Sequence, residues 1–156
     1  MAIVEHPMPA GAAEVFRTLT TPETYPFWLV GCQDIRDVDE AWPAVGSAFH
    51  HRVGLAGPVT LADNTKVLDV EDGRCLVLEV RARPAGRGRV TFTITPDGPD
   101  RSTLRFEEVP LGLLQPLQPA LDPLTVRRNR RSMERLAGFL GVRHVLAAGE
   151  ASDPGV

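Results

Sequence analysis

The chain has 156 residues, a formal net charge of -3 and two cysteines, Cys32 and Cys75. This length suffices for one domain with a substantial core that needs neither disulfides nor metals. A negative net charge argues against a general nucleic-acid-binding protein, which needs a basic surface. No apolar run reaches the roughly 18 residues of a membrane-spanning helix. Two cysteines make no disulfide framework, so we predict a cytoplasmic protein. One domain is expected over residues 1–146, with a disordered tail over residues 147–156.

The N-terminal residues predict one strand and two short helices. Alternation of apolar and polar residues over Ala2 to His6 predicts an edge strand, and the apolar spacing over Ala12 to Leu19 predicts an amphipathic helix. Thr21 suits an N-cap and Pro22 suits the first helical position of a second helix. Pro26 should end that helix early.

From Cys32 onward the apolar pattern has a period of two, which predicts an antiparallel meander. Asp72-Gly73 and Asp97-Gly98 are turn signals, and Gly86 and Gly88 mark another predicted turn. The predicted strands run over Ile35 to Val38, Ser47 to Val53, Thr60 to Val70, Cys75 to Arg83, Arg89 to Thr95 and Ser102 to Val109.

The stretch from about Leu117 to Leu140 predicts one long helix. Its inward stripe, with spacings of three and four, comprises Val126, Asn129, Met133, Leu136 and Leu140. The arginine cluster over Arg127 to Arg131 takes mostly other directions, so a solvated helix face is the expected role, and contact with an anionic partner is the alternative.

Strand alternation predicts which side chains of the meander face this helix. The apolar ones include Phe49, Leu78, Val80, Phe92 and Phe106. The same parity turns His51 and Glu108 inward, opposite Asn129, and either Asp63 or Thr65 is a further polar candidate. Polar groups inside a core need hydrogen-bond partners or a wet cavity, so these residues indicate a pocket.

Four stretches carry a resemblance to a known family. They are PAGAAEVFRTLTTPETYPFW at Pro9 to Trp28, WPAVGS at Trp42 to Ser47, DVEDGRCLVLEV at Asp69 to Val80, and DPLTVRRNRRSMERLAGFL at Asp122 to Leu140. Together they resemble the START-like SRPBCC superfamily, in particular its polyketide cyclase/dehydrase branch, over residues 2–141. The resemblance implies an α+β helix-grip fold, in which a curved antiparallel sheet of six to seven strands wraps around a long C-terminal helix.

The resemblance also implies a deep cavity between sheet and helix that holds a small hydrophobic or aromatic molecule. The leucine- and proline-rich segment from Pro110 to Pro123 is then a candidate lid, and the alternative is that its leucines simply cover the core. Trp28 could form a wall of the cavity. The predicted ligand-binding residues are Trp28, Phe49, His51, Leu78, Val80, Phe92, Phe106, Glu108, Asn129 and Met133.

Three function classes stay open at this point. A ligand-binding protein is the leading hypothesis, and a polyketide aromatase/cyclase or dehydratase is the second. For the enzyme, His51 and Glu108 are the candidate acid-base residues, because cyclisation needs α-proton removal and carbonyl polarisation. A structural or regulatory partner protein is the third, and a homodimer is compatible with each.

No cofactor or metal site is expected. Neighbouring residues of a strand point to opposite faces, so His50 and His51 cannot hold one ion, and no cysteine pair has zinc spacing. The chain also has no Gly-rich phosphate loop between a strand and a helix.

Overall fold

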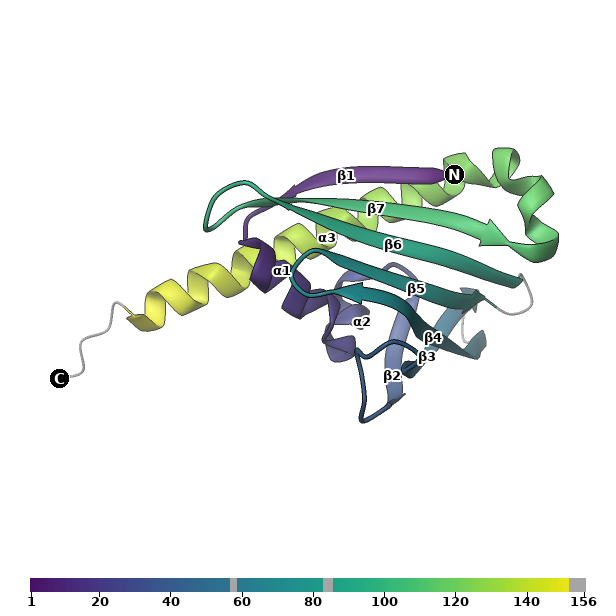
Figure 1. Ribbon diagram of the computed structural model, residues 1–156, viewed down its shortest axis with the longest axis horizontal. Coiled ribbons are helices and arrows are strands. Elements are labelled where there is room, and N and C mark those ends of the chain that lie inside the picture. The colour runs from purple at the N-terminus through teal and green to yellow at the C-terminus, as the bar shows by residue number, and fades with distance from the viewer. Residues whose placement is uncertain (57–58, 83–85, 152–156) are drawn as a thin grey trace.

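The computed structural model describes residues 1–56, 59–82 and 86–151, and in these ranges seven strands form a single antiparallel sheet (Figure 1). The spatial order of the strands is β1-β7-β6-β5-β4-β3-β2. The strands are β1 (Ala2–Met8), β2 (Cys32–Val38), β3 (Ala48–Ala56), β4 (Val59–Glu71), β5 (Cys75–Ala82), β6 (Gly86–Pro96) and β7 (Ser102–Leu111). Strands β2 to β7 therefore form a meander, and β1 joins it at the far edge.

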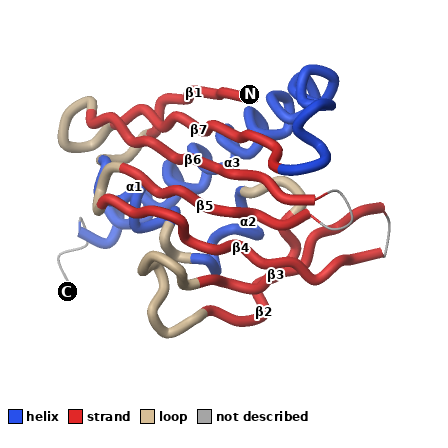
Figure 2. Tube along the Cα trace, turned by 45° about the vertical axis from the view of Figure 1, so that its right-hand side comes forward, coloured by secondary structure: helices blue, strands red, loops and turns tan. Residues whose placement is uncertain are grey.

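All helices lie on one face of this sheet, and the long helix crosses behind the strands (Figure 2). They are α1 (Ala12–Leu19), the 3-10 turn η1 (Pro22–Thr24), α2 (Tyr25–Trp28), the 3-10 turn η2 (Gly112–Leu117) and α3 (Gln118–Ala151). This arrangement confirms the predicted α+β helix-grip fold.

Local sequence explains the edge strand and the turn between β4 and β5. Pro7 lies within β1, which is tolerated because β1 is an edge strand with one side unpaired. Between β4 and β5, Gly73 has a φ of 70°, a conformation that side-chain-bearing residues rarely adopt. The Arg74 amide donates to the Glu71 carbonyl at 3.0 Å and closes this turn.

Two predicted boundaries are wrong. Gly86 and Gly88 belong to β6 instead of a turn, because Gly88 pairs with Val80 on one side and with Pro110 on the other. Helix α3 continues past Leu140 to Ala151, since nothing beyond the end of the apolar stripe stops a helix there. Residues 147–151 of the predicted tail are thus helical, and residues 152–156 lie outside the described part of the chain.

The candidate lid is not a separate segment. Strand β7 occupies its first residues, η2 the middle, and α3 begins at Gln118, so Pro119 lies in the first turn of the helix, where amides have no intrahelical acceptor. Leu117 is 54% exposed. The side chains of Leu113 and Leu114 lie outside the described residues, and the mobility of the segment stays a prediction.

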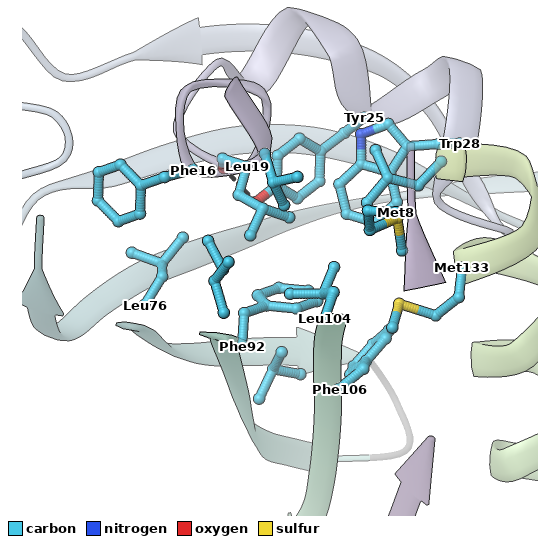
Figure 3. Packing of buried hydrophobic residues seen from close by; sticks show 14 of the residues in the cluster. Met8, Phe16, Leu19, Tyr25, Trp28, Leu76, Phe92, Leu104, Phe106 and Met133 are labelled. Atoms are coloured by element: carbon cyan, nitrogen blue, oxygen red, sulfur yellow. Dashed lines mark hydrogen bonds between the residues drawn. The ribbon is translucent and has the colours of Figure 1, made fainter. Parts of the chain in front are cut away.

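The filled part of the core lies between the sheet and the helices, around Tyr25 and Trp28 of α2 (Figure 3). The Trp28 ring packs 4.7 Å from Tyr25 and 6.2 Å from Phe92, centroid to centroid. Its Nε1 donates to Thr24 Oγ1 at 3.1 Å, and the Tyr25 hydroxyl donates to the Leu19 carbonyl at 2.7 Å. Both polar atoms are therefore satisfied inside the core.

Candidate functional site

A cavity of about 130 Å³ lies between the sheet and α3, which we name the His51 cavity. Its apolar lining comes from Leu29, Val30, Val53, Val80, Val90 and Phe106. Its polar lining comes from Cys32, His51, Thr65, Arg81, Glu108 and Arg128. Most of the exposed wall surface is apolar, and the polar residues come from six elements, namely β2, β3, β4, β5, β7 and α3.

Strand alternation carries the same inward face from the core into this cavity. On β3, Phe49 packs in the core and His51, two residues on, lines the cavity. On β5 the same step leads from Leu78 to Val80, two residues further along the same face. The open volume therefore begins where the large aromatic side chains end.

His51 is 6% exposed and has only one of its two ring nitrogens bonded. Nε2 lies 3.1 Å from Thr65 Oγ1, and Nδ1 is buried with no hydrogen-bond partner in the described part of the chain. Burial lowers the pKa of His51, the charge of Asp63 on the paired strand opposes this, and His50 lowers the pKa further. The ring is consequently held neutral, with one donor or acceptor left over.

Glu108 is bound from two positions of α3. Arg128 Nη2 and Asn129 Nδ2 both donate to Glu108 Oε2, the latter at 3.0 Å. Arg128 also donates to Asn129 Oδ1 through Nε at 3.1 Å and Nη2 at 2.9 Å. Asn129 is fully buried, and this cluster supplies partners to its amide group.

A second cavity of about 190 Å³ lies beside the first, towards the N-terminal end of α3. Gly88, Leu121, Leu124 and Thr125 contribute to its wall, and we name it the Leu121 cavity. Val80, Glu108 and Arg128 line both cavities. The Arg128–Glu108 ion pair thus stands at the boundary of the two.

The loop after α2 forms another wall of the His51 cavity. The Val30 amide donates to Ser132 Oγ at 3.0 Å, which ties the loop to α3. Cys32, at the start of β2, has its thiol pKa raised to about 11 by burial and by the charge of Asp34. The thiol is therefore a neutral part of the lining.

The structure brings together four of the predicted ligand-binding residues in the lining of the His51 cavity, namely His51, Val80, Phe106 and Glu108. Asn129 stands behind this lining, bonded to Glu108. The others pack in the core beside the cavity: Trp28, Phe49, Leu78, Phe92 and Met133. Figure 3 shows Met133 pointing from α3 towards Phe106. Of the two additional polar candidates, Thr65 lines the cavity, and Asp63 is buried on the same face.

Arg128 was predicted to lie on the solvated face of the helix with the other arginines of the cluster. The structure instead pairs it with Glu108 in the lining of the His51 cavity. The signal that points to it is Glu108, since an inward carboxylate needs a cation or several donors. A long arginine side chain can reach such a partner from the margin of a helix stripe. Gly88 was also missed as lining, and its lack of a side chain leaves volume open in the Leu121 cavity.

Within the described ranges, no group of three or more histidine, cysteine or acidic side chains is arranged to hold a metal ion. In the same residues no helix has both the length and the apolar character needed to cross a membrane.

Residues 2–140 match the family described as polyketide cyclase / dehydrase and lipid transport. The chain belongs to this family. No curated protein matches it. The match agrees with the resemblance to the START-like SRPBCC superfamily.

Solved structures share the fold of this family member. A START superfamily protein from Mycobacterium smegmatis is 17% identical with a TM-score of 0.68, covering 89% of this chain and 97% of its own. Protein MLL2253 from Mesorhizobium loti is 24% identical with a TM-score of 0.60, over 86% of this chain and 94% of its own. The di-domain ARO/CYC BexL from the BE-7585A biosynthetic pathway is 13% identical with a TM-score of 0.64, over 88% of this chain and 46% of BexL. At these identities the likeness establishes the fold.

Proposed function

We propose that the protein binds a ring-sized, largely apolar molecule that carries an oxygen group, and that it does so in the His51 cavity. The observation that carries this proposal is that His51 lines a cavity with mostly apolar walls and has a buried Nδ1 with no hydrogen-bond partner among the described residues. An unpaired buried polar atom costs roughly 1–3 kcal/mol, so a ligand that bonds to it gains affinity and orientation.

The volume sets the size of the ligand. An apolar protein cavity of about 150 Å³ holds one benzene molecule. The His51 cavity, at about 130 Å³, is close to this size. A single substituted ring therefore fits, with Phe106 and Val80 against its faces and edges.

The chemistry of His51 favours a hydroxyl or carbonyl oxygen on that ring. A neutral imidazole has one donor and one acceptor nitrogen, and a hydroxyl group can pair with either. The hydroxyl of Thr65, which pairs with Nε2 of the imidazole, can likewise donate or accept a hydrogen bond. A phenolic hydroxyl thus suits both tautomers of His51.

The family supports a hydrophobic ligand, since its description names both lipid transport and polyketide cyclase / dehydrase members. The acid-base roles of His51 and Glu108 stay a prediction. Two donors hold Glu108 as a hydrogen-bond acceptor, whereas one ring nitrogen of His51 has no partner among the residues that the structure describes. His51 is therefore the better candidate of the two for removing a proton from a bound molecule.

A titration with 4-methylphenol, followed by NMR chemical shifts, tests the proposal. We expect the amide signals of β3, β5 and β7 around the cavity to shift in a saturable manner. Val80→Phe fills the cavity and should weaken the affinity at least tenfold. Val77→Phe makes the same change on the opposite face of β5 and should leave the affinity within about twofold.

Saturable shifts confined to residues away from the cavity would overturn the proposal. Equal affinities of the two variants would do the same, because only one of them occupies the proposed site.

A further inference from the structure

We propose that the preferred ligand is an anion, and that Arg128 is the residue that selects it by donating to a carboxylate or similar oxygen group. This inference rests on the proposed function and specifies the chemistry of the ligand. It is supported by the position of Arg128 in the lining of the His51 cavity and by the unused donors of its guanidinium group.

The charged side chains on the cavity side of the lining are Arg128 and Glu108, which pair with each other. Arg81 also contributes to the lining, but its exposed side chain lies on the same face of β5 as Val77, opposite Val80, so its charge is directed away from the cavity. Among the described residues, Arg128 is thus the cation that can reach a ligand in the cavity.

Arg128 has donors to spare for such a ligand. A guanidinium group carries five N–H bonds, and the structure uses Nε and Nη2 for Asn129 and Glu108. Nη1 has no partner in the described part of the chain. Arg128 can therefore keep its bond to Glu108 and still donate to a ligand, so binding need not leave a carboxylate unpaired inside the protein.

Asn129 and Ser132 hold Arg128 in place for this role. The Asn129 amide oxygen accepts two bonds from the guanidinium, and Ser132 Oγ donates to the Arg128 carbonyl at 3.1 Å. A guanidinium fixed at two nitrogens loses little further freedom when it binds an anion. Arg127, the preceding residue and the matched control, is exposed and forms no ion pair within the described ranges.

The remaining groups around the cavity do not favour a cation. Cys32 is a neutral thiol, since burial raises its pKa, and burial lowers the pKa of His51. Two further carboxylates act on the lining: Asp63, on the strand paired with β3, opposes the lowering at His51, and Asp34 helps to raise the pKa of Cys32. Glu108 is thus the one carboxylate that lines the cavity in the described part of the chain.

The test compares benzoate with benzamide, which has the same shape without the charge. Dissociation constants come from NMR titrations at pH 7.5 in low salt. We expect the intact protein to bind benzoate at least tenfold more tightly than benzamide, and added salt to reduce this ratio. Arg128→Met should bring the ratio close to one, and Arg127→Met should leave it unchanged.

Arg128→Met leaves Glu108 without its cation and so endangers folding. Arg128→Met combined with Glu108→Gln removes both charges and keeps the local balance. The double variant, checked by its dispersed NMR spectrum, should also bind the two probes equally.

A ratio near one in the intact protein, or a ratio that survives in the folded double variant, would overturn the role of Arg128. Saturable binding of 4-methylphenol in the cavity would then leave the proposed function standing. Failure of all three probes to bind would reject both proposals.

Discussion

At the level of single residues, one ring nitrogen of His51 has a hydrogen-bond partner and the other has none among the described residues. Thr65 holds the ring through Nε2, burial lowers the pKa of His51, and Nδ1 is buried with no hydrogen-bond partner among the described residues. The ring could have been a core histidine with both nitrogens bonded. The buried nitrogen without a partner among the described residues is the observation that supports the proposed binding role of His51.

This arrangement predicts a pH dependence of stability. Because burial lowers the pKa of His51 below the ordinary value of 6.5, the unfolded chain binds a proton before the folded protein does as the pH falls. The free energy of unfolding should therefore decrease below about pH 6.5, by at most about 1.4 kcal/mol per pH unit for one group.

Urea unfolding at pH 7.5, 6.5 and 5.5 measures this effect. His51→Gln should lose less stability than the intact protein over this range, and His144→Gln, at an exposed position, should follow the intact protein. Parallel pH profiles of the intact protein and His51→Gln would contradict the account of His51.

At the level of elements, α3 has two parts with different roles. Its middle buries Met133, Leu136 and Leu140 completely against the core. Beyond Leu140 the helix extends past the edge of the sheet (Figure 1), and there Val142, Val145 and Leu146 are 61–70% exposed. The part of α3 that packs against the core is therefore the part in which the apolar stripe predicted inward-facing residues.

A matched pair of leucine truncations tests this division. Leu136→Ala removes a fully buried side chain and should lower the free energy of unfolding by about 2–5 kcal/mol. Leu146→Ala, at a side chain that is 63% exposed, should change it by less than about 0.5 kcal/mol. Equal losses in urea unfolding would show that the C-terminal part of α3 packs as tightly as its middle.

At the level of the whole molecule, the core is filled at one end of the sheet and open at the other. Aromatic residues from α2, β3, β6 and β7 fill the first end, and the two cavities on either side of the Arg128–Glu108 pair occupy the second. Taken together, the two cavities of about 190 and 130 Å³ reach the volume of roughly 300 Å³ at which ordinary ligand pockets begin. The core is thus packed at one end of the sheet, and the open volume that we propose as the binding site lies at the other.

Much of this could be predicted from the sequence, because periodicity reports which face of a strand is buried. Leu78 and Val80, for example, share a face as predicted, and Glu108 does turn towards α3. Periodicity carries no information on depth along the strand, so it could not tell that Leu78 meets the core and Val80 the cavity. The role of Arg128 depends on how far α3 lies from β7, which only the tertiary structure provides.

The most direct test of the account is a crystal structure of the protein with 4-methylphenol. The account predicts the ring in the His51 cavity beside Phe106 and Val80, with its hydroxyl oxygen at a hydrogen-bonding distance of about 2.7–3.2 Å from His51 Nδ1. A structure in which side chains close the cavity, or in which the molecule binds only at the surface, would contradict it.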